Sequence, residues 1–284
     1  MSQIKVLIPL DGTLFAERAL DLLPALGSLG DLYVRLIGAI DEQELDALPQ
    51  AHDWLEKEER LLREHLELKR RDLEESGMLA GAEVHRGKPA KVILDAADHF
   101  KPDYIVISSH SRSGIQRWRL GSVADKVVRG APCSVIVLGP STVPMRSQVR
   151  NIMVPLDGST LAEAALPRGV ELARGLDARL HLVRVATYPL FADDAGWAWD
   201  AVKSAAGAYL ESTAQRVKTE EVVTAIETGT PATQLLEYAQ KHHIDLIAMT
   251  SHGRGGFLRS ALGSVTNSLL GGRTPVLVIK AGVP

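Results

Sequence analysis

The sequence predicts an α/β protein made of two tandem domains, each a doubly wound parallel sheet with helices on both faces. Long segments of the first half recur in the same order in the second half, and in each half short β-branched apolar runs alternate with helix-like stretches. This alternation is typical of parallel strands joined by right-handed crossovers. The length of 284 residues also suits two domains, because single cores stop growing near this size.

The repeat runs through most of the chain. IKVLIPLDGT at 4–13 recurs as RNIMVPLDGST at 150–160, RGKPAKVILDAADHFKPDYIVISSH at 86–110 recurs as TGTPATQLLEYAQKHHIDLIAMTSH at 228–252, and APCSVIVLG at 131–139 corresponds to RTPVLVIKA at 273–281. A repeat of roughly 140 residues is far longer than a solenoid unit and indicates a duplicated domain. We expect domains at 1–142 and 148–284, with a linker at 143–147 inside the Pro-, Gly- and Ser-containing segment GPSTVPMRS.

Secondary structure is easiest to assign in the second domain. We expect strands near 150–156, 179–186, 221–227, 245–250 and 276–280, and helices near 160–175, 198–218, 231–242 and 264–271. The first domain fits the same plan, with a longer and highly charged second helix around Trp54–Ser76. Its charges are expected to form a solvated face with ion pairs at helical spacing, the alternative being a partner-binding surface. Pro89 and Pro231 mark expected helix starts, where a missing N–H is tolerated.

Charge and composition argue against some classes of binding partner and cellular location. The net charge of −3 gives no electrostatic reason to expect nucleic acid or an anionic membrane surface. No apolar run reaches membrane-spanning length, the N-terminus lacks a signal-peptide pattern, and Cys133 is the only cysteine. We therefore expect no membrane insertion, no intrachain disulfide and a cytoplasmic location. Cys133 is expected to be a buried small hydrophobe, and the adjacent His242 and His243 make a poor metal pair.

One repeated segment carries the chemistry. AMTSHGRGGFLRSALGSVTNSLL at 248–270 places a strand end, a glycine-containing loop and a helix start around one small space. The helix start and its unpaired N–H groups favour phosphate, and Gly253 and Gly263 let the backbone approach where a Cβ would intrude. Ser264 adds a hydroxyl, and Arg254 adds a cationic donor for phosphate oxygens.

Two assignments stay open at this point. Ser122 and Ser264 also suit simple helix N-capping, with Asp125 completing a capping box in the first copy. Asp157 ends the first strand of the second domain, and in a doubly wound sheet the ends of the first and fourth strands flank the ligand crevice. A carboxylate there suits hydrogen bonds from ribose hydroxyls or an adenine amino group, but Asp in LDGS equally suits a turn or a helix cap.

With these motifs in order, the chain resembles a tandem universal stress protein, with two such domains covering nearly all of it. The family's nucleotide-binding signature is Gly, two residues, Gly, nine residues, Gly, then Ser or Thr. At these four positions the second copy has Thr250, Gly253, Gly263 and Ser264, and the first copy has Ser108, Ser111, Gly121 and Ser122. The second copy departs only at the first glycine, whereas the first copy departs at two of the three. VPLDGS, GTPA and TPVLVIK, in the right order, support the resemblance.

The resemblance implies five parallel strands per domain, and a cytosolic stress-response protein that binds ATP or AMP, with or without Mg²⁺, and acts as a regulator or signalling module. Asp157 would contact ribose or base, Val185 would line the adenine pocket, and Gly253–Val265 would hold the phosphates. The expected nucleotide-binding residues are Pro155, Leu156, Asp157, Val185, Met249, Thr250, Gly253, Arg254, Gly263, Ser264, Val265 and Thr266. The expected weak or vestigial site of the first domain comprises Asp11, Ala39, Ser108, Ser111, Gly121 and Ser122.

Other classes of function remain alternatives. The chain is compatible with a nucleotide-free interaction or scaffold protein of the stress response, and with a slow ATPase. It contains no Gly-x-x-x-x-Gly-Lys loop and no evident nucleophile elbow, so no catalytic residue and no metal site is assigned. His110 and His252 are expected to make local hydrogen bonds, phosphate contact being the alternative. We also expect the two domains to pair through their last strands, and the sequence is compatible with a homodimer and with an unidentified protein partner.

Overall fold

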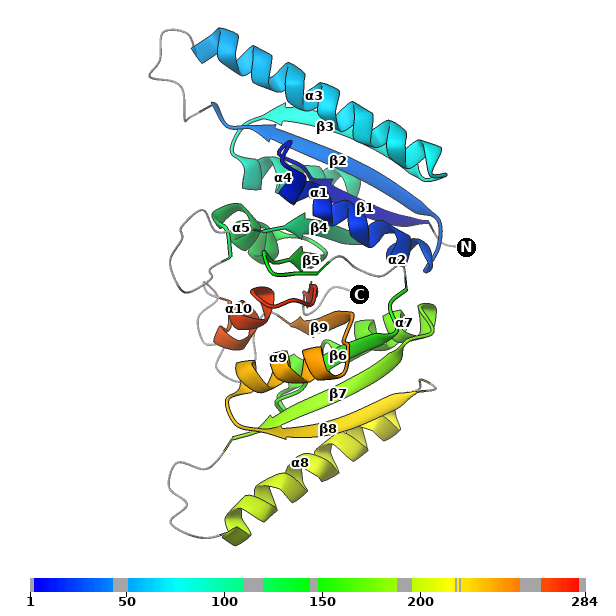
Figure 1. The fold of residues 1–284 in the computed structure, drawn as a ribbon, viewed down its shortest axis with the longest axis vertical. Helices are drawn as coiled ribbons and strands as arrows, with labels where there is room; N and C mark the ends of the chain where they lie inside the picture. The colour runs from blue at the N-terminus through cyan, green and yellow to red at the C-terminus, as the bar shows by residue number, and fades with distance from the viewer. Residues whose placement is uncertain are drawn as a thin grey trace. The chain divides into compact units, whose positions relative to one another are not determined.

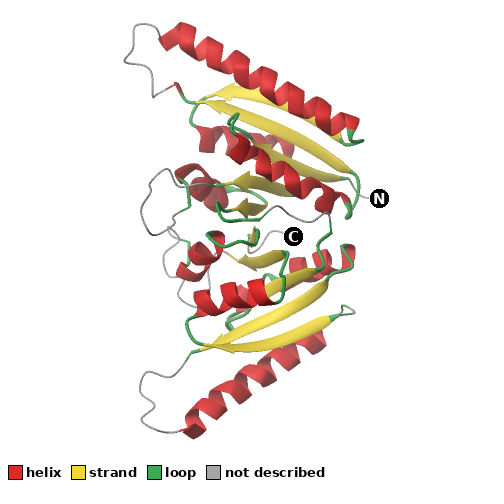
Figure 2. Ribbon diagram, in the orientation of Figure 1, coloured by secondary structure: helices red, strands yellow, loops and turns green. Residues whose placement is uncertain are grey.

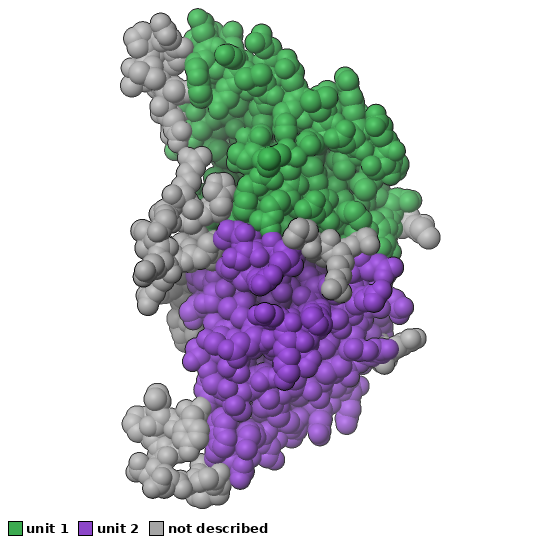
Figure 3. Space-filling model, in the orientation of Figure 1, with its two compact units in different colours: residues 1–138, 283 green, residues 139–282, 284 purple. Residues whose placement is uncertain are grey.

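The structure is a computed structural model, and it describes residues 3–42, 51–109, 120–143, 148–187, 196–217, 219, 221–250 and 262–280. The chain divides into two compact units, residues 1–138 and 139–282 (Figure 3). Both units have the α/β architecture that the sequence predicts. The finer domain bounds and the pairing of the two units through their last strands stay predictions.

The first unit is built on a wholly parallel sheet (Figure 1). Its strands are β1 Ile4–Pro9, β2 Leu32–Ile40, β3 Leu79–Arg86, β4 Tyr104–Ser108 and β5 Ser134–Leu138. Across the sheet they are ordered β3-β2-β1-β4-β5. The order reverses direction between β1 and β4, which makes this boundary the switch point of a doubly wound sheet.

Helices cover both faces of this sheet (Figure 2). They are α1 Leu14–Glu17, the 3-10 helix η1 Arg18–Leu22, α2 Leu23–Gly27, α3 Ala51–Glu75, α4 Pro89–Phe100 and α5 Ser122–Gly130. The long helix α3 packs along β2 and β3, while α4 packs on β2 and against α5. As predicted, α3 carries ion pairs at helical spacing, among them Arg63 with Glu59 at 2.8 Å. It also carries the exposed apolar side chains Trp54, Leu61 and Leu68.

The second unit repeats the plan with strand order β10-β9-β6-β7-β8. Its strands are β6 Asn151–Pro155, β7 Arg179–Ala186, β8 Val222–Thr228, β9 Leu246–Thr250 and β10 Val276–Ile279. Its helices are α6 Thr160–Glu163, α7 Leu166–Gly175, α8 Gly196–Arg216, α9 Pro231–Lys241 and α10 Ser264–Leu270. The strands predicted for this half are therefore confirmed within two residues at each end.

One predicted helix was wrong. The sequence pattern indicated a single helix near 160–175, but the structure breaks it into α6 and α7. Pro167 occupies the second position of α7. It has no N–H to donate to the carbonyl of Glu163, and its ring would clash there, so the chain turns before the helix resumes.

The central strands are buried on both faces. Val6, Leu7 and Ile8 of β1 are 0% exposed, and the core of β6 is equally buried. Continuous apolar burial is expected where helices cover both sides of a parallel sheet. Cys133 is also buried, as predicted. In the described residues, no helix combines the length and apolar character needed to cross a membrane.

Candidate functional site

In the first unit, β1 and β4 separate before their carboxyl ends. Their registered pairing stops at Leu7 and Ile105, although both strands continue. Beyond that point the N–H of Leu10 donates to a β2 carbonyl at 2.9 Å, and the N–H of Ser109 donates to a β5 carbonyl at 2.8 Å. Beyond the point of separation, β1 thus stays hydrogen-bonded to β2, and β4 stays hydrogen-bonded to β5. A crevice opens between β1 and β4 at the switch point.

The second unit separates its strands in the same way. The pairing of β6 with β9 stops at Met153 and Ile247. The N–H of Leu156 then donates to a β7 carbonyl at 2.8 Å, while β9 stays paired with β10 as far as Thr250. The duplication has therefore preserved the geometry of the carboxyl edge as well as the order of the strands.

An aspartate turn follows the first strand of each unit. Asp11 Oδ1 accepts hydrogen bonds from Thr13 N–H at 3.0 Å and from Thr13 Oγ1 at 2.6 Å. Asp157 Oδ1 accepts the same pair from Ser159, at 2.9 and 2.6 Å. Gly12 and Gly158, the central residues of the two turns, have φ of +79° and +83°. This is a left-handed conformation that glycine adopts at little cost. Asp157 is thus a turn-former, and the turn fixes its carboxylate at the edge of the crevice.

Helices α5 and α10 begin at this edge without a side-chain cap. Gly121 and Gly263 are the N-cap residues, and neither helix has a side-chain capping hydrogen bond. Ser122 and Ser264 are the first residues inside the helices and are exposed, so the N-capping alternative is wrong. Asp125 does not complete a capping box but pairs with Arg129 at 2.7 Å. The hydroxyls of Ser122 and Ser264 therefore make no capping hydrogen bond.

Two small polar side chains fix the ends of the fourth strands. Ser109, 3% exposed, accepts a hydrogen bond from Gly121 N–H at 2.9 Å, which ties the end of β4 to the start of α5. Thr250, 4% exposed, donates its hydroxyl to the carbonyl of Leu161 at 3.0 Å. The residue that replaces the first signature glycine thus turns its hydroxyl toward α6, where the hydroxyl stabilises the packing of α6 on β9.

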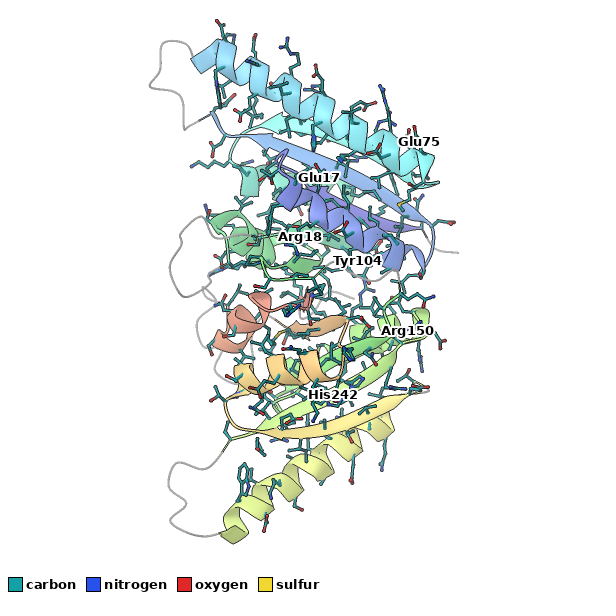
Figure 4. The ribbon with its side chains drawn as sticks, viewed as in Figure 1. Glu17, Arg18, Glu75, Tyr104, Arg150 and His242 are labelled. Atoms are coloured by element: carbon teal, nitrogen blue, oxygen red, sulfur yellow. The ribbon has the colours of Figure 1, made fainter. Side chains whose placement is uncertain are left out.

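A glutamate joins the first helix of each unit to its long helix. Glu17 (labelled in Figure 4) contacts His65 of α3 at 3.2 Å and Lys69 at 2.8 Å. In the second unit, Glu163 accepts from Tyr209 Oη of α8 at 2.9 Å. Burial and this hydrogen bond raise the pKa of Tyr209 to about 12. The helix that follows each aspartate turn is therefore anchored to the long helix of its own unit.

In the first unit the crevice is a pocket of about 1190 Å³. Its walls come from the carboxyl ends of β1, β2 and β4, from the first turns of α4 and α5, and from α3. The pocket brings together Asp11, Ala39, Ser108, Gly121 and Ser122, all predicted for the site of this domain. Ser111 lies outside the described residues. The volume is somewhat above the usual range for small-molecule sites.

Sequence reasoning missed several side chains of this pocket. Lys88, Lys126, Trp54 and His65 all line it. A signal for Lys88 was present, because it directly precedes the predicted helix start at Pro89, and crossover helices start above the carboxyl edge of a parallel sheet. No local pattern indicated that α3 would reach the pocket.

The residues predicted to bind nucleotide in the second unit lie at the matching edge. Pro155 ends β6 and is followed by Leu156 and Asp157, Val185 belongs to β7, and Met249 and Thr250 end β9. Gly263 is the N-cap of α10, and Ser264, Val265 and Thr266 are its first residues. The side chains of Leu156 and Thr266 are only 3% and 2% exposed, so they are packed inside the fold. Gly253, Arg254, His110 and His252 lie outside the described residues.

The described residues offer no metal centre, since none of their His, Cys, Asp and Glu side chains gather in groups of three or more. The adjacent His242 and His243 have different surroundings. His242 stacks on Tyr238 with 4.1 Å between ring centroids, while His243 is exposed with a φ of +51°.

Comparison with known proteins decides the family. The family model of the universal stress protein family matches two segments, residues 4–139 and 148–280. The chain belongs to the universal stress protein family. The two matches give the tandem arrangement that the repeat predicts.

Individual relatives agree with this assignment. A universal stress protein of Methanocaldococcus jannaschii is 32% identical over 139 residues, covering 47% of this chain and 81% of its own. One from Mycolicibacterium smegmatis is 26% identical over 216 residues, covering 73% and 71%. Among solved structures, a universal stress protein of Archaeoglobus fulgidus is 23% identical, covers 98% of both chains and has a TM-score of 0.71, which supports the fold.

Proposed function

We propose that this protein is a cytoplasmic regulatory or signalling module of the stress response that binds an adenine nucleotide, ATP or AMP, mainly in the C-terminal crevice. The observation that carries the proposal is the opening of the sheet between β6 and β9, with Asp157 on one side and the uncapped start of α10 on the other. Family membership supports the stress-response role.

Each wall of the crevice suits one part of a nucleotide. The carboxylate of Asp157 is held by its turn and is an acceptor for ribose hydroxyls or an adenine amino group. Val185, partly exposed near the end of β7, supplies an apolar contact for a base. The N–H groups of α10 and the Ser264 hydroxyl suit phosphate oxygens. In this proposal Gly253, Arg254 and Gly263 complete the phosphate contacts, with or without Mg²⁺ on the ligand.

The proposal is tested by calorimetric titration with ATP and AMP. The variant is Asp157→Asn, because the amide oxygen of Asn still accepts the turn hydrogen bonds while the negative charge is removed. Hydrogen bonds to charged groups contribute about 1.5–3 kcal/mol, so we expect affinity to fall about ten-fold or more. The matched control is Asp11→Asn, the same change in the other copy, which leaves the C-terminal affinity unchanged.

A second variant tests the loop. Gly253→Ser gives the second copy the residue that the first copy carries at Ser111. If binding requires a left-handed backbone at this position, the change costs about 1–2 kcal/mol and weakens C-terminal binding by about ten-fold. Mass spectrometry of nucleotide released from freshly purified protein identifies the adenylate. Protein that carries no nucleotide and gives no heat with ATP or AMP would refute the proposal and favour a nucleotide-free scaffold.

A further inference from the structure

The short helix α6 connects the C-terminal crevice to the long helix of the same unit. It starts directly after the Asp157 turn, where Ser159 donates to Asp157 Oδ1 at 2.6 Å and, as the N-cap, accepts from Ala162 N–H at 3.1 Å. The carbonyl of Leu161 accepts from Thr250 Oγ1 at the end of β9. Both edges of the crevice are therefore tied to α6.

The last residue of α6 is held by α8, which packs along β7 and β8 (Figure 1). Glu163 Oε1 accepts a hydrogen bond from Tyr209 Oη at 2.9 Å, and Glu163 Oε2 lies 3.2 Å from Arg216 Nη2. The Glu163 side chain is 24% exposed, so its carboxylate is partly shielded from solvent. Hydrogen bonds to a charged acceptor are stronger than neutral ones. Helix α6 is thus attached at both of its ends.

Tyr209 makes a second contact that leads to the opposite wall of the crevice. The guanidinium carbon Cζ of Arg184 lies 4.9 Å from the centroid of the Tyr209 ring, within the range of a cation–π interaction. Arg184 directly precedes Val185 near the end of β7, and successive side chains of a strand point to opposite faces. The contact of Arg184 with α8 therefore fixes the backbone that carries Val185 on the other face.

The first unit lacks the counterpart of this second contact. Leu10 and Leu156 make corresponding backbone hydrogen bonds to the second strand of their units, and this register places Gly38 where the second unit has Arg184. Glycine has no side chain, so in the described part of the first unit only the link through Glu17 remains. A tyrosine that contacts both walls is thus a property of the unit for which we propose the main ligand site.

We infer that Tyr209 is a positioning residue of the C-terminal ligand site. It holds the Asp157 turn through Glu163, and it holds the end of β7 through Arg184. The inference rests on the proposed function, because it takes the C-terminal crevice as the ligand site. Walls that are held in advance leave less ordering for the ligand to impose, and this raises affinity without any contact between Tyr209 and the ligand. By reciprocity, an occupied crevice holds α8 in place more strongly than an empty one.

Two tyrosine variants separate positioning from stability. Tyr209→Phe removes the hydroxyl that donates to Glu163, and Tyr238→Phe removes the hydroxyl that hydrogen-bonds His181 at 2.9 Å. Tyr238 is only 3% exposed, so its variant is expected to lower the urea midpoint at least as much as Tyr209→Phe. In calorimetric titration, Tyr209→Phe is expected to weaken the ATP binding that is sensitive to Asp157→Asn by about five-fold or more, and Tyr238→Phe by less than about two-fold.

A double-mutant cycle assigns the effect to one contact. Glu163→Ala removes the acceptor of the Tyr209 hydroxyl. The variant that combines Glu163→Ala with Tyr209→Phe is expected to lose less ATP affinity than the product of the two single losses, because both changes remove the same hydrogen bond. Glu163→Ala combined with Tyr238→Phe is the control and should give the product of its single losses.

Hydrogen exchange tests the positioning without any ligand. In nucleotide-free protein, Tyr209→Phe is expected to speed exchange in peptides that cover residues 157–165 by about five-fold or more, relative to peptides of β6, and Tyr238→Phe is not. Added ATP should slow exchange of α8 in the parent and in Tyr238→Phe, but much less in Tyr209→Phe.

The outcomes distinguish this inference from the proposed function. Equal losses of ATP affinity in Tyr209→Phe and Tyr238→Phe, independent losses in the cycle of Glu163 with Tyr209, or unchanged exchange at residues 157–165 would overturn the inference and leave the proposed function standing. Parent protein that binds neither ATP nor AMP would refute the proposed function, and with it the role of Tyr209 at a ligand site.

Discussion

A buried histidine is expected to make the second unit sensitive to acid. His181 of β7 is 3% exposed, and its ring lies between Tyr238 Oη at 2.9 Å and Asn151 Oδ1 at 3.2 Å. The Asn151 amide nitrogen donates to the carbonyl of His243, so its oxygen faces the ring and the proton of neutral His181 sits on Nε2. Burial, then the neighbouring His242 and Arg179, lower the pKa of His181 to about 4.

This pKa shift determines how the free energy of unfolding changes with pH, in both sign and size. Above pH 6.5 the ring is neutral in the folded and the unfolded chain, and the free energy of unfolding does not depend on it. Between pH 6.5 and 4 the unfolded chain binds a proton that the folded chain does not, so stability falls as the pH falls. A shift from 6.5 to about 4 corresponds to about 3 kcal/mol.

The variant His181→Gln removes the titrating group and keeps an amide donor for Asn151 and an acceptor for Tyr238. Hydrogen exchange of peptides from β7 and α9, measured in urea at pH 7 and pH 4.5, reports the stability of this unit. We expect the parent to lose about 2–3 kcal/mol more than the variant over this range. His243→Asn, an exposed position with positive φ, is the control and should lose as much as the parent. Equal losses in the parent and His181→Gln would refute the reasoning.

Three further predictions concern the frame of the two crevices. Gly38→Ala would bring a Cβ within 2.8 Å of a leucine side chain of α3, so it should lower the free energy of unfolding of the first unit by about 1–3 kcal/mol, measured by urea titration. Gly81→Ala is the control, because the atom nearest to its Cβ is 3.5 Å away, and it should change the stability little. Thr13→Ala removes the side-chain cap of α1 and should cost about 1 kcal/mol by the same assay, whereas an unchanged midpoint would contradict the capping role. Glu163→Gln should bring the pKa of Tyr209 down from about 12 toward 10, as ultraviolet titration of tyrosinate would show; an unmoved titration would assign the shift to burial alone.

The sequence by itself determined the architecture and the position of the crevices. The repeat and the alternation of apolar runs with helical segments specified parallel sheets, because the two periodicities are local properties of the chain. Asp157 was expected at the end of the first strand of its domain, and it lies two residues after β6, since a turn motif directly follows an apolar run. The single helix predicted at 160–175 was wrong, and it shows the limit of this reasoning. The helical pattern of apolar residues continues through Pro167, but a proline at this position interrupts the backbone hydrogen bonds of the helix.

Tertiary structure decided which side chains meet at the crevice. Lys88, Lys126 and Trp54 are far apart in the chain and line one pocket only because α3, α4 and α5 begin at the same edge of the sheet. The direction of Thr250 was equally undetermined, as its hydroxyl is taken by a carbonyl of α6. Local patterns fix where a backbone turns, but the partner of a side chain depends on which distant element packs against it, and that is set by burial of the whole core.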